Sequence, residues 1–189
     1  NSEKQIIERF KREVKTTNLL NVMRHGFMDR GIKFYPIFWK PETSLNETTQ
    51  IQYDANILHC TRQLHYSVHN ENSIDIVLFV NGIPVVSIEL KCQFTGQDTT
   101  NAINQYKFDR AGKDTIFAFK ERVLVHFAVD LTNVYMTTRL EGAHTYFLPF
   151  NQGSNGAGKV GGKGNPVNPD GYDTAYLWER VLCKDSLME

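Results

Sequence analysis

The chain has 189 residues, 41% of them hydrophobic, which is enough to build one domain around a single buried core. Its 21 Lys and Arg residues balance 21 Asp and Glu residues, so no overall positive field attracts a nucleic acid, and any DNA contact must come from a local patch. No run of about eighteen apolar residues is present, which argues against a membrane span and leads us to expect a cytoplasmic protein.

The N-terminal part of the chain is predicted to begin with two helices. Ile6, Phe10 and Val14 recur at helical spacing, which predicts an amphipathic helix over residues 3–15. A second, shorter helix is expected over residues 18–25. Because the first residue is not Met and the last residues have helical character, we expect the chain to be a piece of a longer protein.

Strands and a further helix are expected in the next part of the chain. The aromatic residues between positions 34 and 39 predict a strand that Pro36 interrupts, and therefore a strand near an edge. Residues 46–56 are expected to be helical. From Leu58 to Val68 apolar and polar residues alternate, which predicts a strand with one buried side.

The clearest pattern in the sequence is a β-hairpin. Two apolar segments, Ser73–Val80 and Ile83–Lys91, are separated by Asn81 and Gly82, a dipeptide that tolerates positive φ and is typical of tight hairpin turns. A helix over residues 99–110 is expected to follow.

The C-terminal part is predicted to complete a sheet and then cross a long loop. Strands are expected over Val123–Val129, Val134–Leu140 and Tyr146–Phe150. Seven of the 13 glycines fall in the loop predicted at about 151–173, which cannot pack a core and should be exposed. Residues Ala175–Leu187 return to helical character.

These elements predict an α/β fold, with a central mixed sheet of five or more strands flanked by helices, in a single domain over residues 1–189. The three cysteines, Cys60, Cys92 and Cys183, form no C-x-x-C pair, so they predict neither a disulfide framework nor a zinc ribbon. We expect reduced and mostly buried thiols.

Three charged residues interrupt the apolar hairpin: Asp75, Glu89 and Lys91. Charges in such a segment are costly unless they are paired or bind a metal. Glu89 and Lys91 lie two residues apart on one strand, so both side chains leave the same face. Two carboxylates beside an ammonium suit Mg²⁺, which takes few carboxylates and can both polarise a phosphate and supply a bound water as nucleophile.

Asp75 can join this site only if its side chain leaves the face of Glu89. A strict two-residue turn pairs Val80 with Ile83 and therefore Asp75 with Ile88, which directs Asp75 away from Glu89. An odd-length loop or a β-bulge shifts the pairing by one residue and brings the two carboxylates to one face. We therefore predict such a loop or bulge in this hairpin.

Asp75, thirteen further residues, and then Glu89-x-Lys91 match the PD-(D/E)xK nuclease pattern, with Ile74 in place of the Pro. The surrounding sequence resembles the N-terminal nuclease region of type I restriction endonuclease R subunits, in unbroken order over about residues 19–187. The segments that carry the resemblance include RHGF, FWKP, SIDIVLFVNGIPVVSIELK, TGQDTTNAINQYKFDR and NPDGYDTAYLWERVLCKDSL.

The resemblance implies a restriction-endonuclease-like fold and a set of roles. Asp75, Glu89 and the main-chain carbonyl of Leu90 would bind Mg²⁺, and Lys91 would orient or activate the attacking water. Gln105 would match the Gln of the Q-x-x-x-Y element that these nucleases place beside the metal. The chain departs from that element, because residue 109 is Asp.

The resemblance also implies the partners of a bacterial type I restriction-modification enzyme. These are double-stranded DNA, specificity and methyltransferase subunits, and an ATP-driven helicase or translocase further along the same chain. ATP would be used by the parent enzyme and not bound by this part of it.

Two other interpretations stay open at this level. A non-catalytic DNA-binding or docking module could keep the same fold and use Asp75, Glu89 and Lys91 as a structural ion cluster. The sequence GSNGAGK at residues 153–159 approaches a phosphate-binding loop, but Val160 replaces the hydroxyl residue and the following glycines preclude a helix. We treat that motif as fortuitous.

Overall fold

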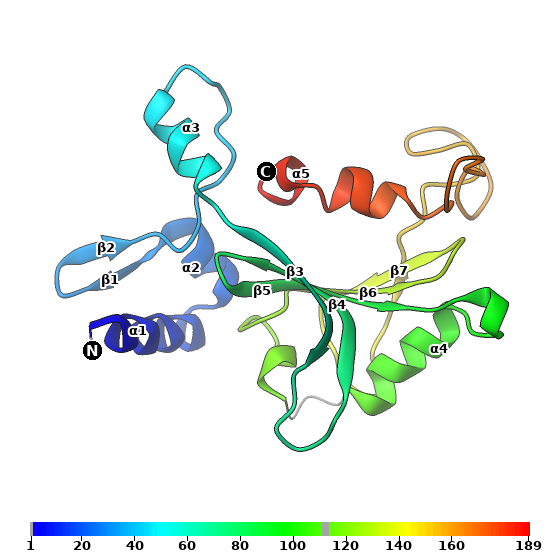
Figure 1. Cartoon of the computed structure of the whole chain (residues 1–189), viewed down its shortest axis with the longest axis horizontal. Coiled ribbons are helices and arrows are strands. Elements are labelled where there is room, and N and C mark those ends of the chain that lie inside the picture. The colour runs from blue at the N-terminus through cyan, green and yellow to red at the C-terminus, as the bar shows by residue number, and fades with distance from the viewer. Residues whose placement is uncertain (1, 111–113) are drawn as a thin grey trace.

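The computed structural model describes residues 2–110 and 114–189, and its centre is a six-stranded mixed sheet (Figure 1). The strands, in sheet order, are β3 (Leu58–His65), β4 (Ser73–Val80), β5 (Ile83–Leu90), β6 (Val125–Val129), β7 (Val134–Thr137) and β8 (Leu148–Pro149). Strands β5 and β6 run parallel, whereas the other neighbouring pairs are antiparallel. The predicted α/β fold with a mixed sheet is confirmed.

Helical segments cover both faces of this sheet. The α- and π-helical segments are α1 (Ser2–Thr16), α2 (Leu19–His25), α3 (Glu47–Asp54), α4 (Thr99–Asn104), a π-helical turn (Gln105–Asp109), a second π-helical turn (Leu177–Val181) and α5 (Lys184–Leu187). In Figure 1, α4 lies below the sheet and the C-terminal helical segment lies above it. No helix within the described ranges is both long and apolar enough to cross a lipid bilayer.

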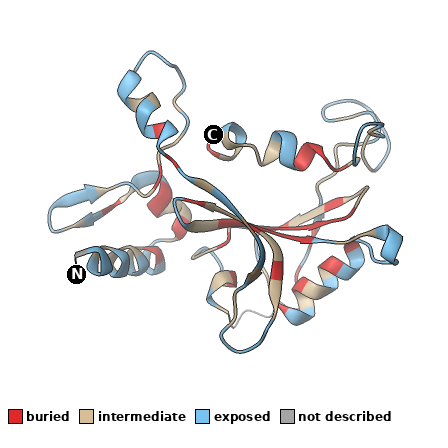
Figure 2. Cartoon of the chain, viewed as in Figure 1, coloured by how far each residue is buried: buried red, intermediate tan, exposed pale blue. Residues whose placement is uncertain are grey.

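The core forms two layers, one on each face of the sheet (Figure 2). Ile88 of β5 and Phe127 of β6 belong to the layer that also contains residues of α1, α2 and the C-terminal segment. Ala128, the neighbour of Phe127, belongs to the other layer, which lies between the sheet and α4 and also contains Tyr106. This alternation follows from the two-residue period of a strand, and it means that both faces of the central strands are buried.

The aromatic segment between positions 34 and 39 differs from the prediction. The strands here are β1 (Phe27–Asp29) and β2 (Ile32–Phe34), a small separate hairpin closed by Arg30 and Gly31, both with positive φ. The chain leaves the hairpin before Pro36, which has no N–H for a ladder hydrogen bond. Trp39 instead packs against the core, and its ring N–H donates to the Met23 carbonyl.

The predicted C-terminal helix over 175–187 is wrong in its continuity. A π-helical turn ends at Val181, Cys183 is extended, and α5 then begins as a separate short helix. Leu177 and Met188 anchor the two pieces in the core, and the main-chain N–H of Lys40 donates to the Met188 carbonyl. Tertiary contacts at both ends therefore override the helical continuity that the residue pattern suggested.

The glycine-rich segment is exposed and contains neither helix nor strand from residue 151 to 173, as predicted. Hydrogen bonds between Gly153 and Gly164, and between Ser154 and Gly162, close it into a loop of defined shape. The expectation of buried thiols is wrong, because Cys60 is exposed and the other two cysteines are half-buried.

Candidate metal centre

The β4–β5 hairpin contains the irregularity that its charged residues require. Asn81 and Gly82 form a two-residue turn with φ of 49° and 80°, and Val80 pairs with Ile83. Two residues later the register shifts by one, because Val85 is an extra residue on β5. The predicted bulge is therefore confirmed, and it lies within the strand rather than in the turn.

Beyond the bulge, Ile76 pairs with Ile88, and the same register places Asp75 opposite Glu89. Asp75 Oδ2 accepts a hydrogen bond of 2.8 Å from the main-chain N–H of Leu90, which fixes its position at this end of β5. The two carboxylates thus leave the same face of the sheet, the face covered by α4. The geometric condition for a shared site is met.

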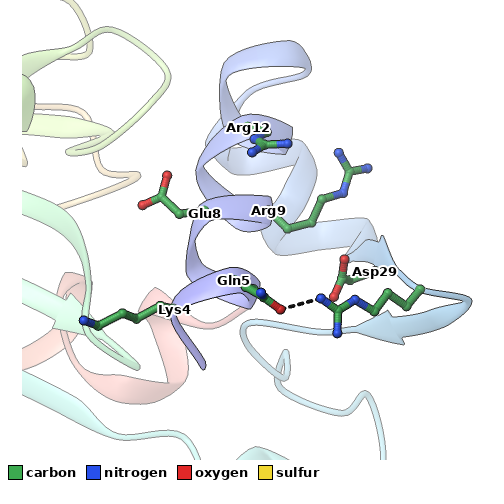
Figure 3. Close-up of a pocket in the computed structure, with 7 residues that line it drawn as sticks. Lys4, Gln5, Glu8, Arg9, Arg12 and Asp29 are labelled. Atoms are coloured by element: carbon green, nitrogen blue, oxygen red, sulfur yellow. Dashed lines mark hydrogen bonds between the residues drawn. The ribbon is translucent and has the colours of Figure 1, made fainter. Parts of the chain in front are cut away.

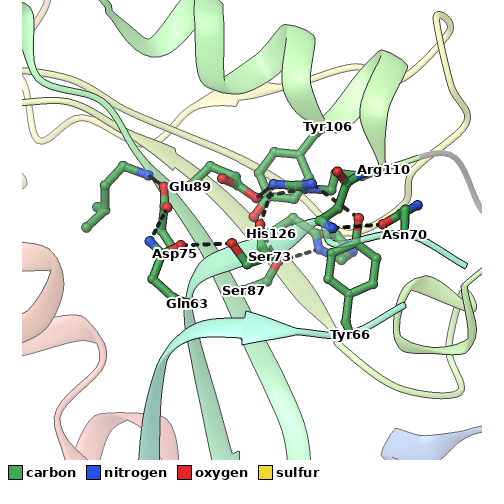
Figure 4. Close-up of polar contacts among 12 residues, drawn as sticks. Gln63, Tyr66, Asn70, Ser73, Asp75, Ser87, Glu89, Tyr106, Arg110 and His126 are labelled. Carbon is green, nitrogen blue, oxygen red and sulfur yellow. Dashed lines mark hydrogen bonds and ion pairs between the residues drawn. The ribbon is translucent and has the colours of Figure 1, made fainter. Parts of the chain in front are cut away.

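Asp75 is half-buried, and one further side chain holds it. Gln63 Nε2 donates to Asp75 Oδ1 over 2.8 Å, and Gln63 Oε1 accepts from the Ser73 hydroxyl (Figure 4). Gln63 has φ of 48° and is left out of the β3–β4 pairing. A non-glycine residue in the left-handed region is unusual, and such strain is concentrated at functional sites.

Glu89 is fully buried and paired with Arg110. Arg110 Nε donates to Glu89 Oε1 over 2.9 Å, and Arg110 Nη2 forms an ion pair with the same oxygen over 2.8 Å. The other oxygen, Oε2, accepts no hydrogen bond from any described residue. Burial raises the pKa of Glu89 to about 7, against the opposing effect of the Arg110 charge, and the nearby negative charge of Asp75 raises it further.

A neutral hydrogen-bonded network lies beside Glu89. Ser87, two residues earlier on the same face of β5, hydrogen-bonds through its hydroxyl to Tyr106 Oη and His126 Nδ1, each over 2.8 Å. All three side chains are buried. Burial lowers the pKa of His126 to about 3 and raises that of Tyr106 well above its usual value, so both are uncharged at neutral pH.

Lys91 follows β5 and lies half-buried, with its main-chain N–H bonded to the Val129 carbonyl over 2.8 Å. In the part of the chain that the structure describes, its ammonium forms no ion pair with Asp75 or Glu89. It lines a polar surface hollow together with Gln97, Asn101, Asn104, Gln105, Phe108 and Asp109. Lys91 and Gln105 therefore line the same hollow.

Local hydrogen bonding explains where α4 and the π-turn after it present their side chains. Asp98 begins α4 with a capping box, accepting from main-chain N–H groups while the Asn101 side chain bonds back to it. After Asn104 the helix widens into the π-turn, in which the N–H of Arg110 bonds to the carbonyl of Gln105. Sequence reasoning missed Arg110, because no local pattern marks a helix residue that neutralises a distant buried carboxylate.

The arrangement fits a hard divalent cation. No group of three or more His, Cys, Asp or Glu side chains that could hold a metal is present among residues 2–110 and 114–189. A cation at Asp75 and Glu89 would therefore complete its shell with main-chain oxygen, water and substrate, as Mg²⁺ commonly does. The unpartnered Oε2 of Glu89 is the oxygen free to accept it.

A second hollow, between α1 and the β1–β2 hairpin, contains none of these residues (Figure 3). Arg9 there pairs with Glu13, and Arg30 bonds to Gln5. Because Glu8 and Asp29 also line it, this hollow combines both signs of charge.

Comparison with known proteins identifies the family. Neither the curated proteins nor the solved structures contain a significant match. Residues 1–145 of the 189-residue chain match the family described as type I restriction enzyme R protein N terminus. The match spans α1 through β7 and includes every residue of the candidate site. The chain therefore belongs to the family of N-terminal regions of type I restriction enzyme R subunits.

Proposed function

We propose that this chain is a Mg²⁺-dependent endonuclease domain that hydrolyses phosphodiester bonds of double-stranded DNA. The observation that carries the proposal is the bulged register that sets Asp75 opposite Glu89, with Oε2 of Glu89 buried and unpartnered. Asp75, Glu89 and the carbonyl of Leu90 would hold the ion. When bound, Mg²⁺ would polarise the scissile phosphate and lower the pKa of a coordinated water.

The other residues of the site would act on the substrate. Lys91, which forms no ion pair in the described structure, would neutralise the charge that develops on the phosphate and orient the attacking water. Gln105, in the same hollow, would donate a hydrogen bond to the phosphate or that water. In these roles, Lys91 and Gln105 would not compete with Mg²⁺ for the carboxylates of Asp75 and Glu89.

Membership in this family implies a multi-subunit enzyme that acts on DNA. We propose that an ATP-driven translocase in the same polypeptide, together with specificity and methyltransferase subunits, supplies movement and sequence recognition. The net charge of zero supports this assignment of DNA binding to other parts of the enzyme, because neutralising several phosphates requires a surplus of basic residues. We also propose that residues 1–189 form one domain.

One observation favours the alternative, a non-catalytic DNA-binding or docking module. Arg110 already neutralises Glu89, so the cluster could serve as a structural ion pair. Calorimetric titration of the chain with Mn²⁺ separates the two. The nuclease proposal requires binding that Asp75→Asn weakens by about tenfold or more. Absence of binding in the wild-type chain would favour the module.

The function itself is tested by Lys91→Ala in the complete enzyme with its DNA substrate. We expect cleavage to be lost while ATP hydrolysis persists, because Lys91 lies outside any translocase. Lys33→Ala, an exposed residue on β2, is the matched control and should cleave normally. Normal cleavage by the Lys91→Ala enzyme would contradict the assignment.

A further inference from the structure

Arg110 is the most heavily engaged side chain of the site. It is only 2% exposed, and besides Glu89 it donates to the Tyr66 hydroxyl over 3.2 Å and to the Ser73 carbonyl over 2.6 Å. Figure 4 shows Arg110, Tyr66 and Tyr106 gathered at one end of the cluster and Asp75 with Gln63 at the other. The guanidinium is therefore fixed by contacts independent of Glu89.

The pairing of Arg110 with Glu89 is asymmetric. An Arg–carboxylate pair frequently forms two parallel hydrogen bonds, one to each carboxylate oxygen. Here Nε and Nη2 both converge on Oε1, and Oε2 remains buried without a partner among the described residues. A buried, unsatisfied acceptor is unfavourable by itself, so its persistence beside a second carboxylate points to a cation.

The π-turn accounts for how Arg110 reaches this position. Because a π-turn closes hydrogen bonds between residues five apart, Gln105 and Arg110 lie one turn apart along the helix. Gln105 then lines the outer hollow with Lys91, while Arg110 extends to the buried carboxylate. Single π-turns of this kind occur frequently at functional sites.

We propose that Arg110 is a positioning residue for the metal centre: it holds Oε1 of Glu89 so that Oε2 is presented to a divalent cation shared with Asp75. This inference rests on the proposed nuclease function. Arg110 does not touch the ion or the substrate. It fixes the side-chain rotamer of Glu89, the ligand. Its positive charge also offsets part of the repulsion between the carboxylates of Glu89 and Asp75.

The test compares Arg110→Lys with the wild-type chain by calorimetric titration with Mn²⁺ and by urea unfolding. Lys keeps the charge but cannot hold one oxygen between two nitrogens of a fixed fork. We expect about tenfold weaker Mn²⁺ binding, the usual effect of removing an outer partner of a metal ligand. Arg122→Lys, at a half-buried residue whose guanidinium donates to the neighbouring Glu121 carbonyl, is the matched control and should bind like wild type.

Each outcome decides a different point. If Arg110→Lys binds Mn²⁺ as tightly as wild type or more tightly, Arg110 is only a structural or competing charge and the positioning role is overturned. Absence of Mn²⁺ binding in the wild-type chain would overturn the metal centre, and the positioning role with it.

A second variant guards against failure of Arg110→Lys to fold. Tyr66→Phe removes one anchor of the guanidinium and leaves Glu89 and Arg110 intact. We expect a smaller loss of Mn²⁺ affinity, roughly threefold, with an unchanged urea midpoint. In the complete enzyme the same variant should raise the Mg²⁺ concentration for half-maximal cleavage, with the rate restored at saturating Mg²⁺. Unchanged Mn²⁺ affinity and Mg²⁺ dependence would contradict the positioning role.

Discussion

Glu89 and Asp75 lie opposite each other on neighbouring strands, but different kinds of partner hold them. Glu89 is fully buried, and a guanidinium holds it. Asp75 is half-buried, and an amide side chain and a main-chain N–H hold it. We call the buried side the inner end, which comprises Ser87, Glu89, Tyr106, Arg110 and His126. The outer end comprises Gln63, Asp75, Lys91 and Gln105.

The difference separates stability from chemistry. At the inner end, charges and polar atoms are removed from water, so losing one partner leaves another unsatisfied. At the outer end, water can replace a lost partner, and the proposed function would bring an ion and a phosphate to these side chains. We therefore expect substitutions that remove a charge or polar atom at the inner end to destabilise the fold most, and substitutions at the outer end to act mainly on metal binding and cleavage.

The largest effect is expected from breaking the buried ion pair. Arg110→Met should lower the free energy of unfolding by about 3–5 kcal/mol, because Glu89 is left as an uncompensated buried charge. Urea unfolding at pH 8 without divalent cations measures it. The double variant Glu89→Leu with Arg110→Met should recover most of the loss. Asp75→Asn, the outer-end control, should cost less than about 1.5 kcal/mol, and an equal loss in both would break the comparison.

The next effect is the pH dependence that His126 confers. Its folded pKa of about 3 lies below the ordinary value of 6.5, so the unfolded chain binds the proton first. The stability from keeping this side chain neutral is complete above pH 6.5 and declines as the pH falls toward 3. Between pH 7 and pH 4, wild type should lose about 3 kcal/mol more than His126→Gln. Parallel urea curves for the two proteins across this range would contradict the burial argument.

A smaller effect is expected at Gln63, which supports Asp75 from the outer end. Gln63→Gly and Gln63→Ala both remove the hydrogen bond to Asp75 and should weaken Mn²⁺ binding similarly, by about tenfold. They should differ in stability by roughly 1 kcal/mol in favour of Gly, because only Gly adopts φ of 48° without strain. Calorimetry and urea unfolding measure the two quantities. Unequal Mn²⁺ affinities would show that strain, not the amide, sets the position of Asp75.

The smallest change in stability is expected at Gln105. Gln105→Ala should alter the free energy of unfolding by less than about 0.5 kcal/mol, because the side chain is half-exposed. Cleavage by the complete enzyme should nevertheless fall by about tenfold, with Mn²⁺ affinity unchanged. Gln52→Ala, an exposed residue of α3, should cleave normally. Full activity of the Gln105→Ala enzyme would remove Gln105 from the proposed site.

Much of the hairpin was predictable because its signals are local. Alternating apolar residues and the Asn81–Gly82 turn identify β4 and β5, and simple parity shows that Asp75 and Glu89 meet only across an irregularity. The position of the bulge at Val85 was not predictable. It depends on β6 as well, since the Leu124 N–H bonds to the Val85 carbonyl, and no local pattern reports a contact across the sheet.

The sequence by itself determined the class of fold, the loop at about 151–173 and, through its resemblance, the family and the candidate residues Asp75, Glu89, Leu90, Lys91 and Gln105. These depend on local propensity, on alternation along the strands, and on the order of recognisable segments.

Only the tertiary structure decided how each candidate is held. It revealed Arg110, the unpartnered oxygen of Glu89, the exposure of Cys60 and the break before α5. These features arise where segments far apart in sequence meet and exclude water, and burial, not sequence spacing, sets the energy of a charge there. The outer end of the candidate metal centre follows the sequence pattern, whereas the inner end exists only in the folded chain.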